Sequence, residues 1–291
     1  MRSLLFVPGG SEKKLDKARG SGADALLIDL EDSISPERKE TARTVTLAFL
    51  KDFGQATRRP RLFVRVNGLA SGLIDDDLAV IEGRPDGIVL PKAEGGAAVI
   101  HADAKLTARE AMHDLPDRHV QILALATETA KALFLAGTFT ASSPRLIGLT
   151  WGAEDLSAEL GAEANRDADG QFLDPYRLAR SLCLAGAAAA EVQPIDTVYI
   201  DFRNAAGLRR ECEEARRDGF TGKMAIHPGQ VEVINDVFTP TQDAVARAQK
   251  VVAAFAAEPG AGVVGIDGVM YDRPHLAKAR QLLARAEAVK R

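Results

Sequence analysis

The sequence has few cysteines, no excess of basic charge and no long hydrophobic run, and each of these absences excludes a class of protein. Only Cys183 and Cys212 are cysteines among 291 residues, which argues against a disulfide framework and favours a reducing compartment. The formal net charge of -4 argues against nucleic acid or an anionic membrane as the main partner. The apolar run at residues 4–7 is too short for a signal peptide, and no later run could span a membrane. We therefore expect a cytoplasmic protein.

The sequence also lacks an internal repeat and a glycine-rich dinucleotide loop. After the first apolar run, residues 8–12 read PGGSE rather than G-x-G-x-x-G, which argues against an open dinucleotide-binding sheet. Instead, short apolar runs alternate with helix-like stretches along the chain. There are eight such runs, at residues 4–7, 25–30, 62–66, 87–90, 121–125, 146–149, 197–200 and 224–226.

This alternation predicts a (β/α)8 barrel. Continuous apolar runs are typical of strands buried on both faces, and alternation with helices is typical of a parallel sheet. Eight units in a chain of this length favour closure into a TIM barrel over the competing open, doubly wound sheet. We expect residues 1–238 to form the barrel and residues 239–291 to form a C-terminal helical extension that packs on a neighbouring subunit.

Polar residues follow the apolar runs. The active site of such a barrel lies at the carboxyl ends of its strands, so the residues at the end of each run are the informative ones. Those found there are Asp29, Glu31, Asp32, Arg65, Asn67, Lys92, Glu128, Asp155, Asp201, Arg203 and His227. The first residues of loops are often polar, but charged residues at the ends of so many successive runs indicate a charged site.

Two of these acids form a candidate cation site. Glu128 follows the fifth run and Asp155 follows the sixth, so adjacent strands carry both to the same end of the sheet. Two carboxylates in a partly buried cleft repel each other unless they share a proton, pair with a base or bind a cation. The alternatives are that Glu128 interacts with a helix dipole and that Asp155 is an N-cap.

Several segments resemble a known family and cover nearly the whole chain in order. They are RSLLFVPG (2–9), ADALLIDLEDSI (23–34), FVRVNG (63–68), DGIVLPKAE (86–94), ETAKAL (128–133), LTWGAEDLSAELG (149–161), GKMAIHPGQVEVINDVFTP (222–240) and MYDRPHLAKA (270–279). Together they resemble the citrate lyase beta-subunit-like family of the HpcH/HpaI aldolase superfamily, which includes malyl-CoA and citramalyl-CoA lyases. The resemblance implies a (β/α)8 barrel, a divalent metal, usually Mg²⁺ with Mn²⁺ as an alternative, and carbon–carbon chemistry on 3-hydroxyacyl-CoA thioesters.

The resemblance also implies roles for particular residues. Glu128 and Asp155 match the metal ligands, and Mg²⁺ needs only one or two protein carboxylates when water and a chelating hydroxy or keto acid supply the other oxygens. Arg65 matches the active-site arginine, which suits substrate capture and stabilisation of an enolate oxygen. Glu31 and Asp32 match an acidic pair expected to act through metal-bound water, although an ion pair with Lys39 or Arg65 is the structural alternative.

Near the end of the chain, Asp272 in MYDRPH matches an acid that the family contributes from a neighbouring subunit. The break at residues 259–262, Pro-Gly-Ala-Gly, would permit the tail to swing away from the barrel. We therefore expect a homo-oligomer, a trimer, in which Asp272 handles the proton on the CoA enolate carbon. A plain C-terminal helix with a surface aspartate is the alternative.

Other polar residues have a structural interpretation that is favoured. For Lys92 an ion pair is favoured over a Schiff base, and for His227 a loop anchor over a catalytic base. Arg2, Lys13 and Lys14 could meet CoA phosphates, although a solvated helix face is favoured for the two lysines. Asn204 stands where many relatives carry an aspartate, which puts any acid role there in doubt.

The expected function is that of a Mg²⁺-dependent carbon–carbon lyase. It would cleave a 3-hydroxyacyl-CoA of the malyl-CoA or citramalyl-CoA type into a short acyl-CoA and a 2-keto acid. The alternatives are malate-synthase-like condensation with thioester hydrolysis, a CoA-independent pyruvate aldolase, and a citrate lyase beta subunit that acts on an acyl carrier protein. The sequence leaves the acyl chain and the direction of reaction open.

Overall fold

The computed structural model describes residues 1–290, with all side chains except that of Lys290. The chain divides into two compact units, Met1–Asn235 and Asp236–Arg291. No helix among the described residues combines the length and the hydropathy that a membrane crossing requires.

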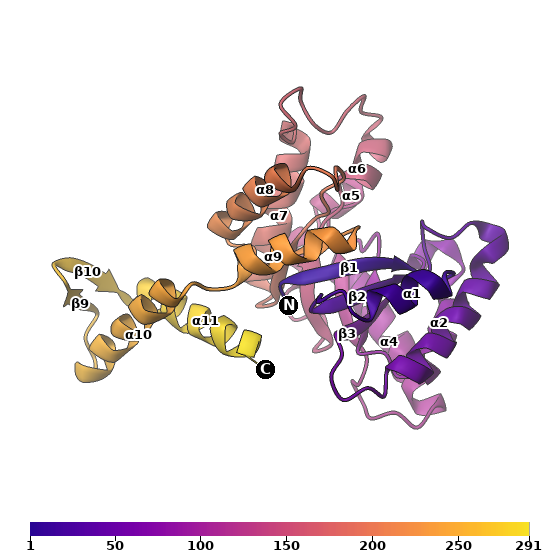
Figure 1. Ribbon diagram of the computed structural model, residues 1–291, viewed down its shortest axis with the longest axis horizontal. Coiled ribbons are helices and arrows are strands. Elements are labelled where there is room, and N and C mark those ends of the chain that lie inside the picture. Colours follow the sequence, from indigo (N-terminus) through magenta and orange to yellow (C-terminus); the bar gives the residue numbers. More distant parts are fainter. Residues whose placement is uncertain (291) are drawn as a thin grey trace. The chain divides into compact units, whose positions relative to one another are not determined.

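The first unit is a closed barrel of eight parallel strands, which confirms the predicted fold class (Figure 1). The strands follow one another around the barrel in sequence order, and β8 pairs with β1. Their bounds are β1 (Ser3–Pro8), β2 (Ala25–Asp29), β3 (Arg61–Arg65), β4 (Gly87–Leu90), β5 (Gln121–Leu125), β6 (Leu146–Thr150), β7 (Gln193–Asp196) and β8 (Gly222–Ala225).

Helices connect successive strands. The α-helices up to the end of the barrel are α1 (Glu12–Ala18), α2 (Lys39–Phe53), α3 (Ile74–Asp77), α4 (Gly96–Met112), α5 (Ala130–Leu133), α6 (Ala153–Leu160), α7 (Asp174–Ala189), α8 (Ala205–Asp218) and α9 (Val231–Phe238). Short 3-10 helices lie between them: η1 (Pro36–Arg38), η2 (Leu69–Ser71), η3 (Leu78–Gly83), η4 (Ala136–Phe139) and η5 (Pro228–Gln230). In α2, for example, Ala42, Thr46, Phe49 and Leu50 are buried, the spacing of an amphipathic helix that covers the barrel.

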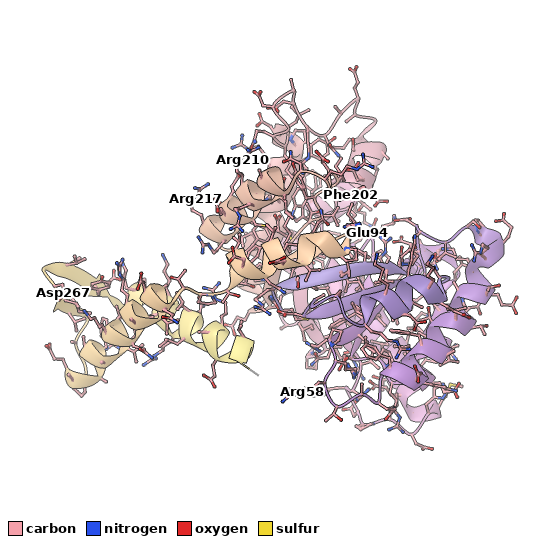
Figure 2. All side chains as sticks on the ribbon, in the orientation of Figure 1. Arg58, Glu94, Phe202, Arg210, Arg217 and Asp267 are labelled. Atoms are coloured by element: carbon pink, nitrogen blue, oxygen red, sulfur yellow. The ribbon has the colours of Figure 1, made fainter. Side chains whose placement is uncertain are left out.

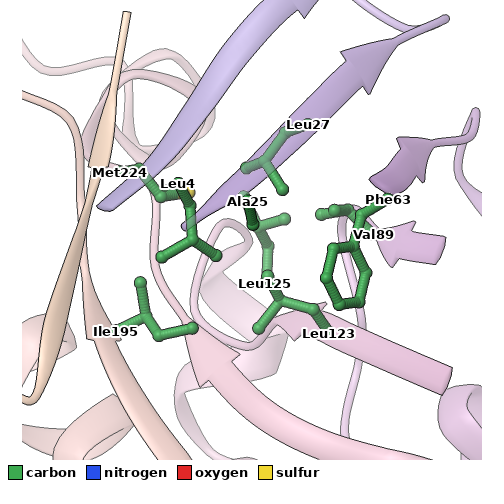
Figure 3. Packing of buried hydrophobic residues seen from close by; sticks show 9 residues of the cluster. All are labelled: Leu4, Ala25, Leu27, Phe63, Val89, Leu123, Leu125, Ile195 and Met224. Carbon is green, nitrogen blue, oxygen red and sulfur yellow. The ribbon is translucent and has the colours of Figure 1, made fainter. Parts of the chain in front are cut away.

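The barrel interior is packed with hydrophobic side chains from every second position of the strands. Figure 3 shows this cluster, which consists of Leu4, Ala25, Leu27, Phe63, Val89, Leu123, Leu125, Ile195 and Met224. Burial of each large side chain contributes about 1.5–3 kcal/mol. Because side chains fill the interior, ligands can be bound only where the strands end.

The seventh strand lies four residues earlier than the sequence predicts. The run at 197–200, Thr-Val-Tyr-Ile, has high strand propensity, but β7 is Gln193–Asp196 and contains Pro194. Tertiary pairing overrides propensity here, because Ile195 is buried in the barrel and pairs with Gly222 of β8. Ile200 is instead 51% exposed beyond the barrel end. The acid at the end of β7 is therefore Asp196, and the predicted Asp201 and Arg203 lie in an exposed loop.

The second unit contains two helices and a β-hairpin. Helices α10 (Gln242–Ala257) and α11 (Arg273–Lys290) flank the antiparallel strands β9 (Val263–Ile266) and β10 (Val269–Asp272). The sequence predicts a helical extension here, and the hairpin between the two helices was not predicted. Asp267 and Gly268 have φ of 51° and 79°, the left-handed conformation that an Asp-Gly hairpin turn requires. The unit has its own hydrophobic core, formed by Ala248, Val251, Phe255, Val264, Leu276 and Ala279.

Candidate active site

A cavity of about 440 Å³ opens at the carboxyl ends of the barrel strands. Four of the residues predicted from the sequence line it: Asp32, Arg65, Glu128 and Asp155. A fifth, Glu31, is 6% exposed and lies within ion-pair distance of Arg65. The structure therefore brings together five of the six predicted site residues.

Arg65 ends β3 and is held by three carboxylates from the end of β2. Its Nε and Nη2 donate to the two oxygens of Asp29 at 2.7 and 2.8 Å, and its Nη1 lies 3.0 Å from Glu31 Oε2 and 3.2 Å from Asp32 Oδ2. Burial alone would lower the pKa of Arg65, but these carboxylates raise it overall. Because Asp29 occupies Nε and Nη2, a ligand would bind at Nη1, where it would share the guanidinium with Glu31 and displace Asp32, whose side chain is 55% exposed.

Lys92 connects two acids from different loops. Its Nζ donates to Glu31 Oε1 at 2.7 Å and lies 3.0 Å from Asp155 Oδ1, so the ion pair expected from the sequence is present. Although burial lowers the pKa of Lys92, Glu31 and Asp155 raise it overall, and the lysine stays charged rather than nucleophilic. For Glu31 burial is the dominant effect and raises the pKa of the carboxyl group despite Arg65 and Lys92.

Glu128 and Asp155 offer carboxylate oxygens to a cation. Glu128 is 2% exposed, and burial together with the negative charge of Asp155 raises its pKa to about 8. Its Oε2 accepts from the backbone N–H of Lys92 at 2.7 Å. A Cβ at Gly152 would lie 2.7 Å from Glu128 Oε1, so only glycine leaves room for this carboxylate.

This donor set fits Mg²⁺ or Mn²⁺. The two carboxylates repel each other in the absence of a cation, and they are hard oxygen ligands. Among residues 1–290 no group of three or more Asp, Glu, His or Cys side chains is arranged around a common point. The remaining ligands would therefore come from water and substrate oxygens, which is how Mg²⁺ is commonly bound.

Trp151 fixes the start of α6, where Gly152 is the N-cap and Asp155 lies in the first turn. The Trp151 side chain is fully buried, and its Nε1 donates to Asp196 Oδ1 at 2.9 Å. Asp196 is paired in turn with Lys223 at 2.8 Å, and Phe172 packs edge-on against Trp151 with ring centroids 5.0 Å apart. Asp196 is not among the predicted site residues, because the seventh strand was predicted four residues too late.

Comparison with known proteins identifies the family. The model of the HpcH/HpaI aldolase/citrate lyase family matches residues 2–228. The chain belongs to this family. Its members include carbon–carbon lyases, among them the mitochondrial citramalyl-CoA lyase of Rattus norvegicus, which is 33% identical over 99% of this chain and 87% of its own length.

Two further relatives in the HpcH/HpaI aldolase/citrate lyase family are informative. A (3S)-malyl-CoA thioesterase of Cereibacter sphaeroides is 39% identical, over 99% of this chain and 95% of its own. The solved structure of CitE from Mycobacterium tuberculosis superposes with a TM-score of 0.77, at 31% identity and with 98% of each chain covered. That structure is a complex with magnesium, acetoacetate and coenzyme A.

The sixth predicted site residue, Asp272, belongs to the second unit. Its carboxylate is 40% exposed and lies 2.5 Å from Nδ1 of His275, whose hydrogen bond lowers the pKa of Asp272. The barrel unit by itself thus lacks the acid that the family resemblance assigns to proton transfer.

The remaining candidates have structural roles in the barrel. His227 anchors a loop as predicted, because its Nδ1 accepts from the backbone N–H of Gly229 at 3.0 Å. Asn204 is the N-cap of α8 and accepts from Gly207 N. Lys13 and Lys14 are exposed on α1.

The suggestion that Arg2 meets CoA phosphates is wrong. Arg2 precedes β1, at the amino end of the barrel, whereas the cavity lies at the carboxyl ends of the strands. It forms an ion pair with Asp24 at 2.7 Å. The prediction placed Arg2 near the first strand without stating at which end of the barrel it lies. Because Arg2 precedes β1, it lies at the end opposite the cavity.

Arg65→Lys is expected to lower kcat/KM strongly while the protein remains folded. Lysine keeps the charge but cannot bind Asp29 through two hydrogen bonds and also present donors to a ligand. The loss should be about 2–4 kcal/mol of transition-state stabilisation, the scale for one preorganised donor. Steady-state kinetics measures it, with Arg61→Lys at the amino end of the same strand as the control. Wild-type kcat/KM in Arg65→Lys would exclude a role at the reacting atoms.

Proposed function

We propose that this protein is a divalent-metal-dependent lyase that cleaves a 3-hydroxyacyl-CoA thioester into a short acyl-CoA and a 2-oxo acid. The observation that carries the proposal is the pairing of Glu128 with Asp155 in one cavity with Arg65. The complex of CitE with magnesium, acetoacetate and coenzyme A supports the choice of metal and of substrate class.

Glu128 and Asp155 would hold the metal, which supplies a Lewis acid for the oxygen at the bond that breaks. Neighbouring residues position both carboxylates in the absence of substrate. Gly152 leaves space for the Glu128 carboxylate, and the Lys92 backbone orients it. Trp151 fixes the start of α6, from whose first turn Asp155 projects.

Cleavage would move the electron pair of the carbon–carbon bond into the thioester, which becomes an enolate. Arg65 lines the cavity and Lys92 is paired with Asp155 beside it, and these two cations would offset the negative charge in a partly buried setting where it is poorly screened. The proton of the substrate hydroxyl passes to a carboxylate. Asp32 suits this role because it is the most exposed of the three acids on Arg65. Glu31 holds Arg65 and Lys92 in place.

The enolate carbon then needs a proton, and Asp272 of a neighbouring subunit, together with its partner His275, would handle this proton transfer. The hairpin that carries Asp272 exposes apolar side chains, with Val263, Val269 and Met270 between 50% and 66% exposed. Such residues are suited to burial against another copy of the chain. We therefore extend the proposal to a homo-oligomer, a trimer, with sites completed by a second chain.

A direct assay tests this function. The purified chain is incubated with Mg²⁺ and with malyl-CoA, citramalyl-CoA, citryl-CoA or the corresponding free acids, and the products are weighed by mass spectrometry. Formation of a shorter acyl-CoA together with a 2-oxo acid supports the lyase. Cleavage of free acids without CoA would instead support the pyruvate aldolase.

Hydrolysis of the thioester is the second candidate, favoured by the 39% identity to a (3S)-malyl-CoA thioesterase. The same cavity would hold the hydroxy acid end while water attacks the thioester. The same assay separates the two reactions, because hydrolysis releases free CoA and an intact hydroxy acid of unchanged carbon number.

A further inference from the structure

A second arginine, Arg166, lies in the wall of the catalytic cavity. It comes from the loop between α6 and α7 and also lines a neighbouring groove of about 670 Å³ between α7 and α8. Its guanidinium carbon lies 3.6 Å from the ring centroid of Phe172 and 5.7 Å from that of Tyr199. Its side chain is 15% exposed. The guanidinium is thus held in place by two aromatic rings.

Only one nitrogen of Arg166 is used by the fold. Nη1 donates to the carbonyl oxygen of Gly170 at 2.7 Å and to Glu211 Oε2 at 2.9 Å. Within residues 1–290, Nε and Nη2 make no hydrogen bond. An ordered guanidinium with donors left over is suited to bind a carboxylate, because the entropy of ordering it has already been spent in folding.

Arg166 and Arg65 lie on opposite sides of the cavity. Arg65 ends β3, whereas Arg166 contacts Tyr199, which follows β7, and Glu211 of the next helix. In a closed ring of eight strands, β3 and β7 are four strands apart and therefore face each other. The same cavity is lined by three apolar residues: Val198, which follows β7, Met224 of β8, and Ile226, which follows β8.

We propose that Arg166 binds a second carboxylate of the substrate, distal to the 2-oxo or 2-hydroxy acid end that is held at Glu128 and Asp155. The 2-oxo acid fragment is then a dicarboxylate rather than a monocarboxylate such as pyruvate. A monocarboxylate would place a methyl group or hydrogen toward Arg166 and leave the donors unused. This inference rests on the proposed function, since it takes the metal end of the cavity as the site of the 2-oxo acid.

Binding of malate and lactate tests the proposal without requiring turnover. The two acids differ only in the distal carboxylate. Trp151, the one tryptophan of the chain, reports binding by fluorescence, because it packs on Phe172 beside Arg166. We expect the wild-type protein with Mg²⁺ to bind malate more tightly than lactate. Arg166→Met should reduce this preference roughly 10- to 100-fold, the range for one hydrogen-bonded charged pair.

Two further variants serve as controls. Arg177 lines the neighbouring groove but not the catalytic cavity, so Arg177→Met should keep the wild-type preference. Arg166→Lys keeps the charge without the planar fork and should retain part of the preference; it decides the question if Arg166→Met fails to fold in thermal unfolding. An unchanged ratio of malate to lactate affinity in a folded Arg166 variant overturns the assignment.

A kinetic arm separates this assignment from the proposed function. Acetyl-CoA is offered with oxaloacetate or with pyruvate, and condensation is followed by product mass. We expect a higher kcat/KM with oxaloacetate and a loss of that advantage in Arg166→Met. If condensation occurs but the preference for oxaloacetate over pyruvate is the same in Arg166→Met, the role of Arg166 is excluded and the lyase proposal stands. If no carbon–carbon bond forms while malate binding still depends on Arg166, the lyase proposal fails and the carboxylate site stands.

Discussion

Glu128→Gln and Asp155→Asn are each expected to abolish metal-dependent turnover without unfolding the barrel. Each change removes a charged oxygen atom from one of the two carboxylates assigned to the metal. The loss of kcat should reach at least about a thousandfold, because several kcal/mol of charge stabilisation depend on the metal. Calorimetric titration with Mg²⁺ measures the binding, and kinetics measures the turnover.

Glu159→Gln is the matched control for this experiment. Glu159 lies on the same helix as Asp155, is exposed, and does not line the cavity. Its variant should bind Mg²⁺ with wild-type affinity. Removing the charge of Glu128 or Asp155 removes their mutual repulsion, which offsets the loss of the ion pair between Asp155 and Lys92, so neither variant should unfold the barrel. Unchanged Mg²⁺ affinity in both variants would show that the metal binds elsewhere.

Asp272→Asn is expected to bind metal and substrate normally but to turn over slowly. Asparagine cannot donate the proton that the enolate carbon requires, and general acid–base catalysis contributes about 10²- to 10⁴-fold. The loss should therefore appear in kcat, with little change in metal affinity. Asp267→Asn is the control, because Asp267 is an exposed aspartate at the turn of the same hairpin (Figure 2) and asparagine tolerates its positive φ.

Subunit mixing decides whether Asp272 acts in trans. Asp272→Asn and Glu128→Gln proteins are dissociated, mixed and reassociated, and mixed oligomers are verified by native mass spectrometry. In such oligomers some sites combine an intact metal end from one chain with an intact Asp272 from the other, so part of the activity should return. The absence of recovery in verified mixed oligomers would exclude donation between subunits.

Much of the barrel and of the metal end of the site follows from local sequence. A strand covered on both faces must be apolar throughout, so the runs around Leu27, Val64 and Leu123 are recognisable without the structure. Parallel strands present their carboxyl ends on one side, so Arg65, Glu128 and Asp155 could be grouped from their positions after the runs. These predictions succeed because burial and strand direction act on a few adjacent residues.

The partners of these residues depend on contacts between distant segments. The strand at β7 was mislocated because Thr197–Ile200 has the better propensity, while pairing with β8 and burial of Ile195 select Gln193–Asp196. Because of this error, neither Asp196 nor the hydrogen bond that it accepts from Trp151 was predicted. Likewise Arg166 follows no strand, and nothing in its local sequence indicates a cavity.

The sequence by itself determined the fold class, the family resemblance and the acids that follow β5 and β6, because each depends on local pattern. Only the tertiary structure decided that Lys92 bridges Glu31 and Asp155, that Gly152 makes room for Glu128, and that Arg166 faces the cavity. Each of these depends on atoms that are dozens of residues apart in sequence. Their distances are set by closure of the barrel, which no local pattern encodes.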